Sequence, residues 1–362
     1  MLTQDRLFAA LASVIDSHTG KDFVSSKAVK NLQLTGSDVA FDVELGYPAK
    51  SQLPAIRESM IAAAKSVAGV GNVLVNVTVK IASHSVQRGV QLLPNVKNII
   101  AVASGKGGVG KSTTAVNLAL ALAAEGASVG LLDADIYGPS QPMMMGLEGR
   151  PQSVDGKNME PMENYGIQVM SIGFLVPKDE AMVWRGPMAT QALEQLLRQT
   201  NWRDLDYLIV DMPPGTGDIQ LTLSQRVPMT GAVIVTTPQD IALLDAKKGI
   251  KMFEKVGVPI LGIVENMAVH VCSQCGHAEH IFGADGGKNL AAEYNMDYLG
   301  ALPLDMQIRL HADNGRPTVV ADPDGEVAAV YKAVARKVAI TVAAKAKDFS
   351  NKFPTITISK NT

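Results

Sequence analysis

Short apolar runs alternate with segments of helical spacing from about residue 96 onward in this chain of 362 residues. Apolar runs of this length, bounded by turn residues, are typical of buried strands. We expect such strands at 99–103, 128–133, 167–171, 206–211, 231–236, 259–264 and 297–300. Strands that alternate with helices indicate a mostly parallel sheet with right-handed crossovers and helices on both faces, an α/β fold.

The first 82 residues have a different pattern, in which two segments, 39–45 and 73–81, alternate polar and apolar residues singly. The order of elements reads helix, strand, strand, helix, strand, with the clearest segments at 5–16, 39–45, 52–67 and 73–81. Alternation with a period of two is typical of half-buried strands, so this part predicts a small α+β domain. We therefore divide the chain into a small domain at 1–82, a polar linker at 83–95, a large α/β domain at 96–347 and a flexible polar tail at 348–362.

A glycine-rich loop, GKGGVGKS, lies between the first strand of the large domain and the helix that follows. It matches G-x-x-x-x-G-K-[ST], the phosphate-binding loop (P-loop), whose backbone N–H groups close on phosphate oxygens at a helix N-terminus. Lys111 would neutralise the phosphates and Ser112 would offer its hydroxyl to Mg²⁺. The predicted nucleotide-binding residues here are Gly105, Lys106, Gly107, Gly108, Val109, Gly110, Lys111, Ser112 and Thr113.

Lys106 is not needed to bind the nucleotide of its own chain. With this extra lysine the loop resembles the branch of P-loop proteins that holds dimerising ATPases such as nitrogenase iron protein, MinD, ParA and Mrp/ApbC. The resemblance implies that Lys106 reaches the nucleotide of a partner subunit and has a catalytic role. It also implies that the protein is a homodimer that hydrolyses ATP.

Three further polar residues follow apolar strands and fill out the nucleotide site. Asp211, at the end of a strand before Met-Pro-Pro-Gly, suits a carboxylate partner of Mg²⁺. Asp135 falls where the resemblance places the catalytic switch I aspartate, which positions the attacking water. In the same resemblance Asn266 reads the adenine edge, for which a side-chain amide has both donor and acceptor.

The composition of the chain argues against two classes of partner, nucleic acids and membranes. A formal net charge of −2 and the lack of a basic run argue against a nucleic-acid partner. The longest apolar run, 115–124, is well short of the roughly 20 residues that a membrane span needs. The valine-rich stripe of the last helix, expected at 326–347, favours core packing over membrane binding. Without an export-signal pattern at the N-terminus, we expect a cytoplasmic protein.

The chain has two cysteines, Cys272 and Cys275, and they form a C-x-x-C pair directly after the strand that ends in Asn266. The residues leave four interpretations open: a redox dithiol, a zinc site completed by His277 and His280, an iron–sulfur site, or two inert thiols. Gly276 next to the pair favours a loop over the helix N-terminus that a redox dithiol requires.

Symmetry favours the iron–sulfur interpretation. A [4Fe–4S] cluster takes four thiolates, and one chain supplies two. A two-fold dimer would bring two C-x-x-C loops face to face and complete the ligand set. Because the loop follows a nucleotide-contacting strand, the ATP state could alter the spacing of the two pairs.

The order of motifs, GKGGVGKS, LLDAD, DMPPGTGD, VENM and CSQC, resembles that of the Mrp/ApbC family of iron–sulfur cluster carriers. The pattern of residues 1–82 resembles the MIP18-like (DUF59) domain that many of these proteins carry, although no cysteine occurs there. The resemblance implies an ATPase that binds a bridging [4Fe–4S] cluster, with ATP and Mg²⁺ as cofactors and with apoproteins and assembly scaffolds as partners. The alternatives are a MinD/ParA-type spatial regulator and a structural zinc protein.

Overall fold

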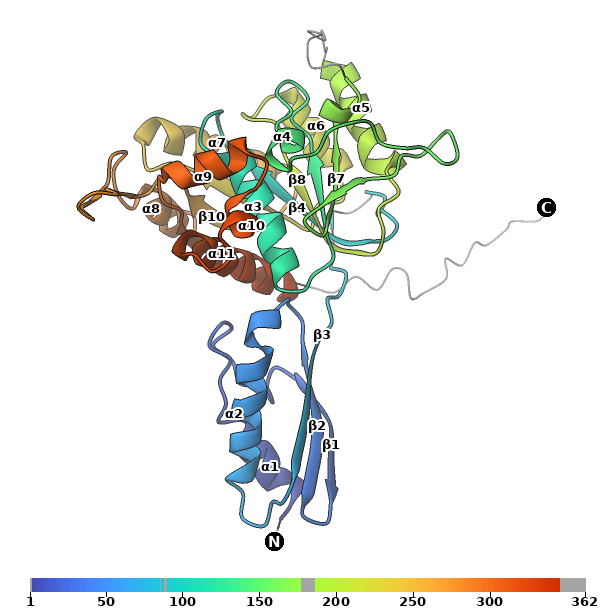
Figure 1. Cartoon of the computed structure of the whole chain (residues 1–362), viewed down its shortest axis with the longest axis vertical. Coiled ribbons are helices and arrows are strands. Elements are labelled where there is room, and N and C mark those ends of the chain that lie inside the picture. Colours follow the sequence, from blue (N-terminus) through green and yellow to red (C-terminus); the bar gives the residue numbers. More distant parts are fainter. Residues whose placement is uncertain (1, 85, 88–89, 177–185, 346–362) are drawn as a thin grey trace, which may run out of the picture.

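The computed structural model describes residues 2–84, 86–87, 90–176 and 186–345, and it confirms the expected fold class. The N-terminal part is a three-stranded sheet with two helices against one face (Figure 1). Strand β2 is central, antiparallel to β1 and parallel to β3. The elements are α1 (Gln4–Leu11), β1 (Val29–Thr35), β2 (Asp38–Leu45), the 3-10 turn η1 (Lys50–Gln52), α2 (Leu53–Lys65) and β3 (Val73–Val79).

The first helix is shorter than its amphipathic pattern predicts. It ends at Leu11 instead of Asp16 because Asp16 makes a turn of its own. The carboxylate of Asp16 accepts the His18 amide at 2.9 Å and the Tyr47 hydroxyl at 2.7 Å, which are bonds that a helical Asp16 would not make.

An eight-stranded sheet forms the centre of the larger part, in the order β13-β10-β9-β4-β8-β5-β7-β6. All the strands predicted from the apolar runs are present, and every neighbouring pair is parallel except β6 with β7. The strands are β4 (Val96–Ala103), β5 (Val129–Asp133), β6 (Met162–Asn164), β7 (Ile167–Ser171), β8 (Leu205–Asp211), β9 (Gly231–Thr236), β10 (Ile260–Glu265) and β13 (Tyr298–Ala301).

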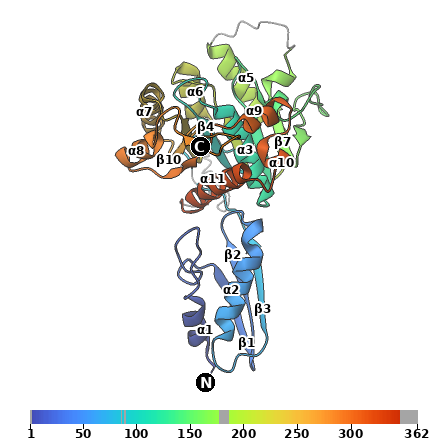
Figure 2. The ribbon, with the colours of Figure 1, turned by 60° about the vertical axis from the view of Figure 1, so that its left-hand side comes forward.

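Helices cover both faces of this sheet (Figure 2). Helices α3, α10 and α11 contact one another, and α5, α6, α7 and α8 form a second series in which each contacts the next. The helices are α3 (Lys111–Ala124), α4 (Gln141–Met144), α5 (Gly186–Gln199), α6 (Asp218–Arg226), α7 (Asp240–Lys255), α8 (Gly286–Glu293), α9 (Met306–Asp313), α10 (Thr318–Ala321) and α11 (Glu326–Ala343).

The last helix packs as its sequence predicts. Its stripe, which includes Val334, Val338 and Val342, is buried in the core. No helix in the described part of the chain is both long and apolar enough to span a bilayer. The expected polar tail, 348–362, lies outside the described residues.

The two parts of the chain meet where the N-terminal end of α2 faces the C-terminal end of α3 (Figure 1). Glu125, only 3% exposed, accepts hydrogen bonds from the amide and hydroxyl of Ser51 at 3.0 and 2.7 Å. Arg336 of α11 forms an ion pair with the same carboxylate at 3.0 Å. The Lys50 amide donates to the Glu125 carbonyl at 3.0 Å. A carboxylate at a helix C-terminus is unfavourable, and these donors offset it.

Replacing Glu125 with alanine should lower the free energy of unfolding by about 3–5 kcal/mol, because it leaves the Arg336 guanidinium buried without its partner. Ser51→Ala removes one hydroxyl donor and should cost only about 1 kcal/mol. Urea denaturation followed by circular dichroism measures both. Equal losses in the two variants would show that the ion pair does not stabilise the junction.

Candidate functional site

The P-loop joins β4 to α3, and the contacts explain its glycines. Gly108 and Gly110 have φ of +83° and +81°, a left-handed conformation that side chains disfavour. A Cβ at Gly110 would collide with the Asn266 amide, and one at Gly105 would collide with the backbone of Asp245 in α7. Glycine is therefore required by close packing at both ends of the loop as well as by its backbone angles.

Asn266 lies at the end of β10, beside the P-loop. Its Nδ2 donates to the Val109 carbonyl at 2.8 Å, and its side chain is buried. The preceding residue, Glu265, is also buried and accepts the Gly287 amide at the start of α8. Burial raises the pKa of Glu265, although the hydrogen bonds from the amides of Gly287 and Lys288 act in the opposite direction. The strand end is thus fixed to the P-loop on one side and to α8 on the other, and the adenine contact of Asn266 stays a prediction.

Lys111 lies in a pocket of carboxylates. Its Nζ donates to Asp211 Oδ1 at 2.5 Å and lies 4.0 Å from Asp135 Oδ2. Nζ also contacts the Ser112 hydroxyl at 3.1 Å. Lys111 is 6% exposed and Asp211 is fully buried. The structure therefore brings together Lys111, Ser112, Asp135 and Asp211, the residues that the sequence predicted for phosphate, metal and water.

Asp133 is a further residue of the site that was not predicted from the sequence, although it belongs to the LLDAD motif and is the last residue of β5. It is fully buried, and its carboxylate accepts the amides of Asp135, Ser140 and Gln141 at 3.0–3.1 Å. The Ser171 hydroxyl donates to it as well, at 3.1 Å. Asp133 thus holds the loop at 134–140 that carries Asp135.

The electrostatics of this cluster favour a bound cation. Burial, and after it the charge of Asp211, raises the pKa of Asp133. Burial also raises the pKa of Asp135, against the opposing effect of Lys111. Carboxylate and hydroxyl oxygens are the ligands that Mg²⁺ prefers. Gln141 Oε1, buried beside Asp211 without a hydrogen-bond partner in the described structure, offers one more oxygen, so the residues fit a Mg²⁺–nucleotide complex.

The two cysteines lie in the turn of a short hairpin formed by β11 (His270–Val271) and β12 (Ala278–Glu279). The Cys272 amide donates to the His277 carbonyl and the Gly276 amide donates to the Cys272 carbonyl, both at 2.9 Å. The amides of Gln274 and Cys275 donate to the Cys272 sulfur and lower its pKa. Cys275 is exposed and Cys272 is partly exposed, so the turn presents two thiols, and amide donors favour the thiolate form of one of them.

The histidines near the turn are engaged elsewhere. His280 Nδ1 lies 2.7 Å from the Ala268 carbonyl, and His270 Nδ1 lies 3.0 Å from the Leu304 carbonyl. His277 is exposed and contacts Glu279 at 3.6 Å. Across the described residues, no three His, Cys, Asp or Glu side chains converge in a geometry that would hold a metal ion. The cysteine pair therefore has no preformed histidine ligands in one described chain.

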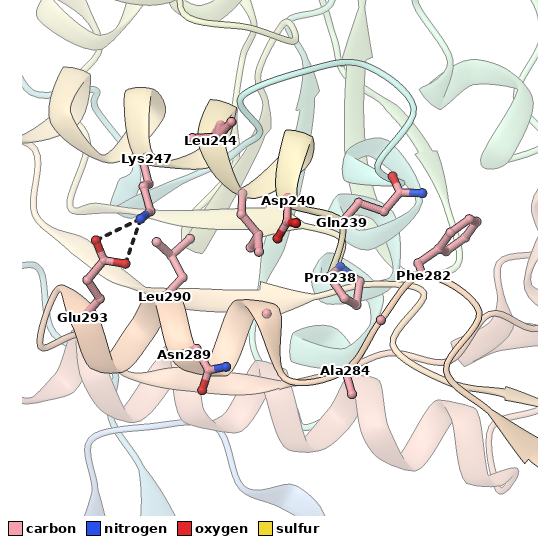
Figure 3. Close-up of a pocket in the computed structure, with 13 residues that line it drawn as sticks. Pro238, Gln239, Asp240, Leu244, Lys247, Phe282, Ala284, Asn289, Leu290 and Glu293 are labelled. Carbon is pink, nitrogen blue, oxygen red and sulfur yellow. Dashed lines mark hydrogen bonds and ion pairs between the residues drawn. The ribbon is translucent and has the colours of Figure 1, made fainter.

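A groove of about 600 Å³, lined by both apolar and polar side chains, lies between α7 and α8 (Figure 3). Its lining includes Leu243, Leu290 and Phe282, and the ion pair of Lys247 with Glu293, at 2.8 Å, crosses one end. No sequence pattern indicated this groove.

The fold and the site define a P-loop nucleotide-binding protein with a cysteine pair on the hairpin that follows the strand end at Asn266. Residues 95–339 match the family model described as NUBPL iron-transfer P-loop NTPase. Residues 4–75 match the model described as iron-sulfur cluster assembly protein. The chain belongs to the NUBPL iron-transfer P-loop NTPase family, which confirms the resemblance to Mrp/ApbC carriers.

Curated relatives are similar over most of the chain. It is 61% identical over 269 residues to an iron-sulfur cluster carrier protein of Pseudomonas fragi, covering 74% of this chain and 94% of the relative. A protein of the same name from Synechocystis is 46% identical over 344 residues, covering 94% and 98%. The mouse iron-sulfur cluster transfer protein NUBPL is 56% identical over 248 residues, covering 68% and 78%.

Solved structures agree with the fold. A nucleotide-binding protein of Archaeoglobus fulgidus in complex with ADP is 39% identical with a TM-score of 0.56, covering 64% of this chain and 90% of that one. The cell division ATPase MinD of Pyrococcus furiosus is 21% identical with a TM-score of 0.51, covering 67% and 98%. At that identity the likeness to MinD shows the shared fold alone.

Proposed function

We propose that this protein is an ATP-hydrolysing carrier that holds an iron–sulfur cluster between two copies of the chain and transfers it to apoproteins. The observation that carries the proposal is the cysteine turn, whose backbone amides stabilise a thiolate at Cys272 on a chain with a complete P-loop site. The names of the relatives, which are cluster carriers and cluster transfer proteins, support it.

In the nucleotide half of the site, Lys111 is the residue that must change partner. It is bound to Asp211 here, and phosphate oxygens at the N-terminus of α3 would compete for its charge. Ser112 and Asp211 would hold Mg²⁺, which neutralises charge on the β- and γ-phosphates when bound. Asp135, held on its loop by Asp133, would accept a hydrogen bond from the attacking water and orient it.

In the cluster half of the site, each chain supplies Cys272 and Cys275, and a two-fold dimer would supply the four thiolates of a [4Fe–4S] cluster. The two halves are joined by a short path. Asn266 contacts Val109 of the P-loop, and the hairpin begins at His270. A change in P-loop conformation would therefore move the root of the cysteine turn, which gives hydrolysis a physical route to cluster binding or release.

Lys106→Ala should reduce ATP turnover by about 10³-fold or more while the chain still folds and binds nucleotide. The Lys106 side chain has no hydrogen bond or ion pair within the described part of its own chain. A cation supplied to the transferred phosphoryl group from a partner is worth about 10³–10⁵-fold. Steady-state turnover at saturating Mg²⁺–ATP measures the loss.

Lys248→Ala is the matched control, because Lys248 is an exposed lysine on α7 whose ion pair is local, with Asp245 three residues earlier. It should hydrolyse ATP at the wild-type rate. If Lys106→Ala also does so, the cross-subunit role is wrong.

Anaerobic reconstitution with iron and sulfide tests the function as a whole. We expect a broad visible absorbance, iron and sulfide bound to the protein, and activation of a purified [4Fe–4S] apoenzyme when the loaded protein is added. Zinc alone in the purified protein would support a structural zinc role. Co-sedimentation with vesicles or DNA that depends on ATP would instead support a spatial regulator.

A further inference from the structure

Gln141 is the first residue of α4 and follows the loop that carries Asp135. Its side chain is fully buried, which is unusual for glutamine. Nε2 donates to Asp211 Oδ2 at 2.8 Å and to the Ser112 carbonyl at 3.1 Å. The backbone amide of Gln141 donates to Asp133 at 3.0 Å. One residue therefore links the P-loop, the end of β8 and the end of β5.

The orientation of the Gln141 amide follows from its neighbours. Both atoms within reach of Nε2, a carboxylate oxygen and a carbonyl oxygen, are acceptors, so the NH₂ group must face them. Oε1 is then the amide atom that faces neither of these acceptors, and it is buried without a hydrogen-bond partner in the described structure. Buried acceptors are rarely left unpaired in native proteins, and the exceptions usually mark a bound water, an ion or a catalytic role.

Gln141 and Lys111 divide the Asp211 carboxylate between them. Lys111 takes Oδ1 and Gln141 takes Oδ2. When phosphates draw Lys111 away, Oδ1 becomes free, whereas the bond from Gln141 keeps the carboxylate in its orientation. The second bond from Nε2, to the Ser112 carbonyl, fixes the backbone of Ser112. The hydroxyl of Ser112 contacts the same Lys111 Nζ that binds Asp211.

We propose that Gln141 is a positioning residue for Mg²⁺: Nε2 fixes Asp211 and Ser112, and Oε1 accepts a hydrogen bond from a water of the metal's hydration shell. The proposal rests on the nucleotide site described under the proposed function. Mg²⁺ retains several of its waters in protein sites, and those waters need acceptors. Outer groups that orient ligands in this way typically change metal affinity by about 10–100-fold.

Gln141→Met tests this role, because methionine keeps the length of the side chain and removes both hydrogen-bonding atoms. ADP binding is measured by calorimetry over a range of Mg²⁺ concentrations and in EDTA. We expect the Mg²⁺ concentration for half-maximal tightening of ADP binding to rise by about 10–100-fold. ADP affinity in EDTA should stay within about twofold of wild type, because Gln141 makes no contact with the predicted phosphate-binding amides.

Gln168→Met is the matched control. Gln168 is another buried glutamine, on β7, and bonds the backbone of Arg203. It should leave the Mg²⁺ dependence unchanged. Gln141→Asn withdraws the amide by one methylene and should shift the Mg²⁺ dependence in the same direction as Gln141→Met, so the test holds if the methionine variant does not fold.

An unchanged Mg²⁺ dependence in a folded Gln141 variant would overturn the proposal, as would an equal shift in Gln168→Met. Failure of the underlying nucleotide site is distinguishable from these outcomes. In that case the wild-type protein itself would bind ADP without any dependence on Mg²⁺.

Discussion

Replacing either Cys272 or Cys275 with alanine should abolish stable cluster binding, whereas the wild-type protein should bind close to four irons per dimer after reconstitution. The expected loss is nearly complete because each change removes two of four thiolate ligands at once in a two-fold dimer. The turn itself should survive, since the backbone hydrogen bonds among Cys272, Gly276 and His277 remain in either variant. Iron and sulfide analysis, with the dimer separated by size-exclusion chromatography, measures the result.

The histidines give the control for this experiment. His277 is exposed and His280 bonds the Ala268 carbonyl, so neither is placed beside the cysteines as a ligand. His277→Ala and His280→Ala should leave the cluster content largely intact, although a Cys₂His₂ zinc site within one chain would lose its metal. A reconstituted monomer that keeps a full metal site, or loss of metal in either histidine variant, would refute the bridged cluster.

Lys111→Ala and Asp135→Asn should each remove ATP hydrolysis, but through different steps. Lys111 is the buried cation between Asp211 and Asp135, so its loss leaves carboxylates facing the incoming phosphates. Nucleotide binding should then be weak. Asp135→Asn keeps the size of the side chain and leaves Lys111 bound to Asp211, so binding of Mg²⁺–ATP should persist. Turnover should fall by about 10²–10⁴-fold because the attacking water loses its charged, basic acceptor.

Equilibrium binding of a fluorescent ATP analogue, with and without Mg²⁺, separates the two variants. Ser128 precedes β5, and its amide bonds Asp206 outside the site. Ser128→Ala therefore serves as the control variant, and its nucleotide binding should equal that of the wild type. Normal turnover in Lys111→Ala or in Asp135→Asn would refute the assignment of that residue. Weak nucleotide binding in both variants would show that Asp135 contributes to the ground state as well.

The central strands were predictable because each is buried on both sides and reads as a continuous apolar run. Strand β6 was missed, since it has three residues, lies at the sheet edge and is only half-buried. The hairpin of β11 and β12 was expected only as a loop, because two-residue strands leave no periodicity to detect. Apolar periodicity thus predicts the elements that form the core and misses short elements at the sheet edge or on the surface.

The residues of the site also fall into those that the sequence predicts and those that it does not. Lys111, Ser112, Asp135 and Asp211 were predictable because they follow strands or belong to a fixed motif, and the structure brings them together. Gln141 carried no signal, since its role depends on contacts with residues 29 and 70 positions away in sequence. The junction of Ser51 with Glu125, which are 74 positions apart, was hidden for the same reason. Contacts of this kind exist only after folding.

The short path from the P-loop to the cysteine turn limits how the chain can vary in length. Between Asn266 and Cys272 the backbone is tied down on the way: Ala268 donates to Leu302 and Leu304 donates to Val269. Surface loops usually tolerate inserted residues at little cost. An inserted residue at 267–271 would instead shift the turn out of register with its partner across the two-fold axis. Under the proposed function, insertions and deletions among relatives should therefore be excluded from this segment, even where the amino acids themselves change.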